Sequence, residues 1–229
     1  MKNILKTFTV TEIVIWISSV IVVSLSYVIS GAGDILTIFA SLIGVTGLIF
    51  VAKGYVFGQV LCIFFALIYG IISLSYRYYG ETITYLCMSL PVALAAVISW
   101  FKHPYKESAE VEVSDLTPKK VTLLSVLTLA VTTAFYFILS ALGTENLVIS
   151  TVSVATSFAA SSLTVLRSPY YAVVYGINDI VLIVLWILAS IEQISYLPMV
   201  LCFIMFLFND MYGFYNWLRI RKRQKAIQA

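Results

Sequence analysis

EIVIWISSVIVVSLSYVIS, residues 12–30, is followed after three residues by DILTIFASLIGVTGLIFVA, residues 34–52. Each stretch carries its only charge at its first position. A helix needs about 20 residues to cross a hydrocarbon core of about 30 Å. These two neighbouring stretches therefore predict two helices that each cross a membrane.

The same pattern continues to the end of the chain. Of the 229 residues, 61% are hydrophobic and 11% are charged, against roughly 45–50% and about 25% in soluble domains. The apolar stretches are 12–30, 34–52, 55–76, 80–101, 120–142, 147–166, 170–190 and 196–218. We therefore predict an all-α membrane protein with about eight transmembrane helices, in which residues 1–229 form a single transmembrane domain.

The basic residues indicate how these helices are oriented. With eight spans, all Lys and Arg residues except Arg77 fall on the side of the membrane that holds both termini. Because cytoplasmic segments are enriched in Lys and Arg, we expect a multi-pass protein of the cell membrane with both termini and the 102–119 linker in the cytoplasm. The basic tail, residues 219–229, is expected to contact lipid headgroups, and no nucleic-acid partner is expected.

A weak internal repeat organises the spans. Residues 79–100 align without a gap over residues 196–217, and both stretches begin with Tyr and end with Trp. In the preceding spans, Gln59 falls near Asn178 if the connecting loops differ by two residues. The spans in 34–101 and in 147–218 also enter the membrane from the same side, as parallel repeats do. We therefore predict two three-helix triplets, joined by an inverting linker helix at 120–142 and preceded by an extra helix at 12–30.

Two acids lie deep inside the predicted spans. Asp179 and Asp210 each follow an asparagine, Asn178 and Asn209, near the middle of the seventh and eighth spans. A charged carboxylate at the centre of a bilayer costs about 2.5–3.5 kcal/mol on insertion scales, so such residues usually face a protein interior or a watery cavity. We expect these acids to face a substrate site between the triplets.

Helical spacing adds further residues to this candidate site. Residues three, four or seven positions apart share a helix face, and several amides and aromatics recur at these spacings. The candidate substrate-binding residues are Trp186, Asn178, Asn209, Gln59, Tyr212, Asp179, Asp210, Tyr69, Asn216 and Trp100. Two alternatives stay open: amides and hydroxyls also join helices to one another, and Trp at helix ends also forms interfacial belts.

The sequence lacks motifs for several other functions. It has no G-x-x-x-x-G-K-[ST] phosphate loop, no H-E-x-x-H and no G-x-S-x-G. Cys62, Cys87 and Cys202 lie in apolar spans without metal-binding spacing. We therefore expect no catalytic residues, no metal and no cofactor. The alternative outside transport is a membrane enzyme or sensor subunit that uses the two acids.

Three segments resemble the PnuC family of vitamin transporters: YRYYG at 76–80, YGINDIVLIVLW at 175–186 and FNDMYGFYNW at 208–217. The resemblance covers about residues 55–218. It implies two three-helix bundles joined by an inverting helix, as in transporters of the SWEET type, assembled as a homotrimer. It also implies facilitated diffusion of an unphosphorylated vitamin, usually nicotinamide riboside, that a separate cytoplasmic kinase then traps. In such a site the aromatic and amide contacts map to Trp186, Asn178, Asn209, Gln59 and Tyr212.

The two acids are not transferred from the family pattern, and they bear on the substrate separately. Nicotinamide riboside carries a fixed pyridinium charge, which an aromatic face attracts by about 0.5–2 kcal/mol and which a carboxylate would also attract. We therefore expect a flat organic cation as the substrate. Thiamine, also a cation, remains an alternative, as do riboflavin and a deoxyribonucleoside.

Overall fold

The structure is a computed structural model that describes residues 7–30, 35–75, 79–106, 108–144, 146–192 and 194–228. Asp34, Arg77 and most of the YRYYG segment lie outside the described residues. The elements are α1 (Val10–Ser30), α2 (Ile35–Ala52), α3 (Val56–Ser75), α4 (Tyr79–Ile83), a π-helical turn η2 (Thr84–Ser89), α5 (Leu90–Lys102), α6 (Pro118–Ala141), α7 (Leu147–Val165), α8 (Tyr171–Glu192), a 3₁₀ turn η3 (Ile194–Tyr196) and α9 (Leu197–Gln228).

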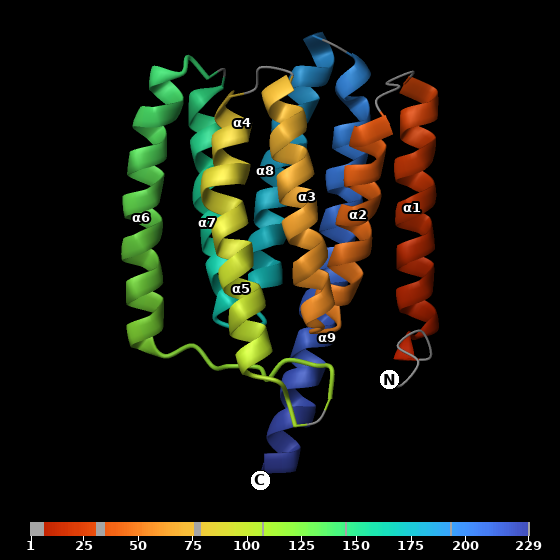
Figure 1. The fold of residues 1–229 in the computed structure, drawn as a ribbon, viewed down its shortest axis with the longest axis vertical. Coiled ribbons are helices and arrows are strands. Elements are labelled where there is room, and N and C mark those ends of the chain that lie inside the picture. Colours follow the sequence, from red (N-terminus) through yellow and green to blue (C-terminus); the bar gives the residue numbers. More distant parts are fainter. Residues whose placement is uncertain are drawn as a thin grey trace.

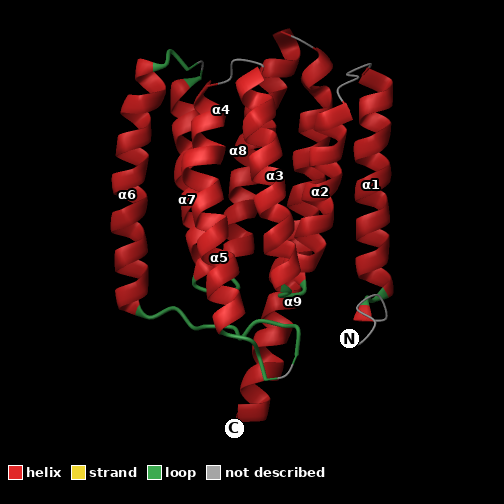
Figure 2. Cartoon of the chain, viewed as in Figure 1, coloured by secondary structure: helices red, strands yellow, loops and turns green. Residues whose placement is uncertain are grey.

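All the long elements are helices that lie side by side with their axes roughly parallel to one common direction, running alternately up and down (Figures 1 and 2). Within the described residues, eight helices are long and apolar enough to cross a membrane, with α4, η2 and α5 together forming one of them. The prediction of an all-α membrane protein with eight spans is confirmed. The helix α6 begins where Thr117 caps it by accepting a hydrogen bond from the Lys120 amide and where Pro118 occupies its first turn.

The helices form two triplets with matching contacts. In the first, α3 packs against α2 and α5, and in the second, α8 packs against α7 and α9. Across the triplets, α2 packs against α9 and α5 packs against α7. In both cases the first helix of one triplet contacts the last helix of the other. Two parallel repeats related by an axis along the membrane normal produce this pattern of contacts. The remaining helices lie outside, since α1 packs on α2 and α9, and α6 packs on α7.

Two tryptophans make the same contact in each repeat. The Trp100 indole donates a hydrogen bond to the Thr164 carbonyl oxygen at 2.8 Å, and the Trp217 indole donates one to the Val51 carbonyl oxygen at 2.9 Å. The two ring systems meet with centroids 5.3 Å apart. Both side chains are fully buried. Each repeat therefore ties its last helix to the end of the other repeat's first helix.

The turns before α3 and α8 also match. Gly54 has φ +70° and Arg167 has φ +57°, and the amide of each donates to the carbonyl oxygen three residues earlier. The residue after each turn residue donates five residues back, Tyr55 to Phe50 and Ser168 to Leu163. Continuing this correspondence along the helices pairs Gln59 with Ala172. The alignment of Gln59 near Asn178, expected from the sequence, is therefore wrong, because the matching turns place Gln59 opposite Ala172, six residues before Asn178.

The linker after α5 packs against the end of the bundle at which α1 begins and α9 ends, which we call the basic end (Figure 1). Its backbone amides reach both repeats, because Val111 donates to the Gly54 carbonyl oxygen at 2.9 Å and Ser114 donates to that of Arg167 at 3.0 Å. Val111 is almost fully buried. The linker therefore lies across the two equivalent turns.

The basic tail continues α9 as helix and holds the linker in place. Buried Gln224 accepts a hydrogen bond from the Val113 amide at 2.8 Å and donates one to the Val111 carbonyl oxygen at 3.0 Å. Asp115 forms ion pairs with Arg221 and Lys225. The hydrogen bond from Lys225 holds the pKa of Asp115 below its ordinary value. Linker and tail together form one packed unit at the basic end.

Candidate functional site

A cavity of about 120 Å³ lies between the two triplets. This is several times the roughly 10–15 Å³ that a single water needs. The described residues that line it come from α2, α3, η2, α5, α7, α8 and α9, and none comes from α1 or α6. The cavity therefore belongs to the two repeats, where the sequence places a substrate site.

Polar groups of the cavity come mainly from α3, α7 and α8. Gln59 on α3 and Asn178 on α8 line it and are buried. Thr156 on α7 donates a hydrogen bond to the Asn178 Oδ1 at 2.8 Å. This contact fixes the amide so that its N–H groups are left to donate to another acceptor. Ser157, Ser161 and Thr164 add hydroxyl groups on the α7 side.

Two carboxyl groups meet in the cavity wall. Asp179 on α8 and Asp210 on α9 are 3% and 4% exposed, and their side chains lie within hydrogen-bonding reach of each other. The Oδ2 atom of Asp179 is buried and has no hydrogen-bond partner. The described residues that line the cavity include no Lys, Arg or His. The charge of this site can therefore only be negative or zero near neutral pH.

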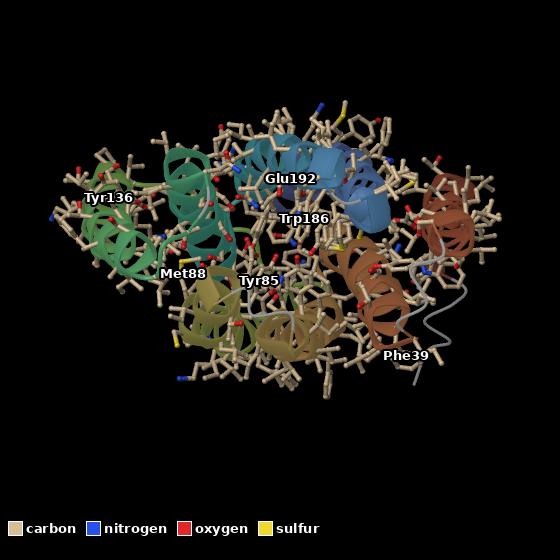
Figure 3. All side chains as sticks on the ribbon, turned by 90° about the horizontal axis from the view of Figure 1, so that it is seen from above. Phe39, Tyr85, Met88, Tyr136, Trp186 and Glu192 are labelled. Atoms are coloured by element: carbon tan, nitrogen blue, oxygen red, sulfur yellow. The ribbon has the colours of Figure 1, made fainter. Side chains whose placement is uncertain are left out.

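Aromatic rings make up much of the remaining wall. They come from α3, η2, α8 and α9 and are Phe65, Tyr85, Tyr171, Tyr175, Phe203 and Phe206. Tyr85 lies in the π-helical turn, and its ring packs on Tyr69 with centroids 4.4 Å apart. Seen from above, Tyr85 and Trp186 lie between the triplets, whereas Phe39 and Tyr136 lie at the outer surface (Figure 3). Single π-helical turns occur frequently at functional sites.

The two repeats contribute unequally to the cavity. Extending the match between the turns along α3 and α8 pairs Asp179 with Ala66, and the gap-free alignment of α5 with α9 pairs Asp210 with Ala93. All four residues line the cavity. The second repeat therefore presents carboxyl groups where the first presents methyl groups, which gives an otherwise two-fold site a polar side and an apolar side.

Comparisons with known proteins place this fold in a family. The family described as "Nicotinamide mononucleotide transporter" matches residues 34–219. The chain belongs to this family of membrane transporters. It is 28% identical over 195 residues to the "Nicotinamide riboside transporter PnuC" of Neisseria mucosa, covering 82% of this chain and 74% of that protein. It also superposes on the "Crystal structure of the Vitamin B3 transporter PnuC" with a TM-score of 0.81 and 26% identity, over 95% of this chain and 94% of the other.

Membership of this transporter family confirms the resemblance drawn from the sequence, and it confirms that the chain is a transporter and not an enzyme. Of the ten candidate site residues, four line the cavity: Gln59, Asn178, Asp179 and Asp210. The structure thus brings together at the cavity the two acids and two of the amide residues that the sequence analysis had proposed as candidates.

Two aromatic candidates lie behind the cavity wall in this transporter fold. Trp186 is buried and packs on Tyr196 with centroids 5.6 Å apart. It belongs to the same apolar cluster as Leu182 and Phe203, which do line the cavity. Tyr69 supports Tyr85 from the same cluster. A direct contact of Trp186 or Tyr69 with substrate stays a prediction.

The other four candidates make contacts between helices. Asn209 donates to Ser19 Oγ at 3.0 Å, and Tyr212 donates to Glu12 Oε1 at 3.0 Å, so both hold α9 against α1. Asn216 donates to the Ala52 carbonyl oxygen at 2.9 Å, next to the bond that Trp217 makes. Trp100 makes the equivalent bond in the other repeat. The structure gives these four residues packing contacts, and a binding role for them stays a prediction.

Tyr171 and Tyr175 line the cavity but were not among the candidates. They precede Asp179 by eight and four residues, which is the spacing of one helix face. Extending the polar stripe of the seventh span backwards would therefore have found both tyrosines. Phe65, Phe203 and Phe206 carry no such signal, because apolar residues surround the helices on every side.

Proposed function

We propose that this transporter carries nicotinamide riboside across the membrane by facilitated diffusion. The observation that carries the proposal is the charge of the cavity, in which two carboxyl groups and six aromatic rings face a space without Lys, Arg or His among the described lining residues. The pyridinium ring of nicotinamide riboside gains from the aromatic faces and from a nearby carboxylate. The name of the Neisseria mucosa relative agrees with this substrate.

The same charge argues against the mononucleotide that the family description names. A phosphate group at pH 7 carries a charge of about −1.5 to −2 and would approach Asp179 and Asp210 with no cationic group in the described wall to offset their repulsion. Transport is therefore expected to require the unphosphorylated riboside.

Uptake by liposomes that contain only this protein tests the proposal. Labelled nicotinamide riboside should enter with saturable kinetics, equilibrate at equal internal and external pH, and then stop. Nicotinamide mononucleotide at the same concentration should neither enter nor compete. Absence of saturable riboside uptake, or uptake of the mononucleotide at a comparable rate, would refute the proposal.

Thiamine is the second candidate substrate, since it is also a flat cation that the two carboxyl groups would attract. Riboflavin and a deoxyribonucleoside are neutral and gain nothing from these acids. Competition of each compound against labelled nicotinamide riboside separates the candidates. We expect thiamine to compete more strongly than either neutral compound, and the reverse order would remove the charge argument.

The cellular arrangement that we propose follows from the basic residues and from the family resemblance. The basic end is the cytoplasmic end, so a reporter fused after Ala229 should be active only in the cytoplasm. A separate cytoplasmic kinase would trap the riboside after entry, and the chain would assemble as a homotrimer. Cross-linking in native membranes should then give a product of three subunits.

A further inference from the structure

We propose that the Asp179–Asp210 pair holds one proton when the cavity is empty and releases it when a positively charged ligand binds. The inference rests on the proposed function in that the ligand is taken to be a flat cation. It goes beyond that function because it makes substrate binding a proton exchange at a defined pair of carboxyl groups.

The two carboxyl groups of the pair lie close enough to share a proton. Both carboxyl groups are buried and within hydrogen-bonding reach of each other. Two adjacent carboxyl groups at a buried site do not both ionise unless another cation lies beside them, and without one they share a proton. One Oδ2 atom of the pair, on Asp179, makes no other hydrogen bond. A single proton between the two groups provides the missing contact and leaves one negative charge.

The described groups around the pair offer no other cation that could replace this proton. The titratable groups that face the pair are Cys62 on α3, Tyr85 on η2, Tyr171 and Tyr175 on α8, and Cys202 on α9. Cys and Tyr side chains are neutral when protonated and negative when ionised, so none of these groups can supply a positive charge to the pair. On the neighbouring α1, Glu12 pairs with Lys53 at 2.9 Å, so that lysine is already occupied. The described groups around Asp179 and Asp210 therefore leave the balancing charge to a proton or to the ligand.

The exchange is balanced in atoms and charge. One O–H bond of the pair breaks and its proton passes to water, which leaves two carboxylates. The pyridinium charge of the ligand takes the place of the proton beside them, so the net charge of the site stays at one negative charge before and after the exchange. No electron is transferred. When the ligand leaves, the pair takes a proton back from water. With equal pH on both sides this exchange adds no driving force, so the transporter only equilibrates its substrate, as the liposome test of the proposed function requires.

Calorimetric titration of the purified full-length transporter tests this. Nicotinamide riboside is titrated at one pH in buffers of different ionisation enthalpy, so that the dependence of the heat on the buffer counts the protons released. About one proton should be released per ligand, and the affinity should rise about tenfold per pH unit while the empty pair holds its proton. The uncharged 1,4-dihydronicotinamide riboside should bind without releasing a proton.

Variants separate the pair from other acids. The double variant Asp179→Asn with Asp210→Asn should release no proton with any ligand that it still binds, whereas Asp115→Asn, in the linker, should release as many protons as the unmodified transporter. Binding of nicotinamide riboside without proton release would overturn the exchange and leave the proposed substrate intact. If neither nicotinamide riboside nor thiamine binds to the unmodified protein, both proposals fall.

Discussion

Replacing Tyr85 and Trp186 separately with Ala decides which aromatic residue contacts the substrate. Tyr85 lines the cavity and Trp186 lies in the cluster behind it. Stacking of a flat ring on an aromatic side chain is worth about 1–3 kcal/mol by alanine substitution. Tyr85→Ala should therefore weaken nicotinamide riboside binding by roughly five- to 150-fold. Tyr85→Phe, which keeps the ring, should bind nearly as well as the unmodified protein.

Trp186→Ala should act mainly on stability. The side chain is 6% exposed and packs on Tyr196 in the core cluster, and truncating a buried Trp costs about 3–5 kcal/mol of unfolding free energy. Thermal unfolding in detergent and ligand titration, both on protein that elutes as a single species, measure the two effects. If Trp186→Ala weakens binding more than Tyr85→Ala does and unfolds at the original temperature, then Trp186 is the stacking residue and the cavity has been assigned to the wrong rings.

Two further outcomes test the packing of the bundle. Gly58→Ala should lower the unfolding temperature in detergent, because a Cβ there would lie 2.4 Å from the Val51 amide nitrogen and force α2 and α3 apart at a cost of about 1–3 kcal/mol. Gly176→Ala is the control, since its Cβ would meet only Leu207 at 3.4 Å, and it should change the unfolding temperature little. The ion pairs of Asp115 should hold the tail at neutral pH and be lost as the pH falls through the lowered pKa of Asp115; a spin label at residue 227 should gain mobility only below about pH 4, and a gain at higher pH would contradict this.

The eight spans and their parallel repeats could be predicted from the sequence because each depends on local properties. Length and apolarity decide whether a segment crosses a bilayer, and the placement of Lys and Arg sets the expected orientation. The acids at Asp179 and Asp210 could be assigned to an interior because a charge in lipid is costly. None of these inferences needs to know which helices touch.

The choice of neighbours was decided only by the tertiary structure. Helical spacing put Asp179 and Trp186 on one face, yet two turns of helix separate them, so that the acid lines the cavity and the Trp packs behind it. Asn209 was predicted to face the substrate site for the same reason as Asp210, but its side chain donates a hydrogen bond to Ser19 on α1, a helix outside the repeats. Lipid and helix interfaces are both apolar, so the sequence carries little contrast between the two faces of a span. Which polar residue meets the cavity is settled by partners that lie far away in the chain.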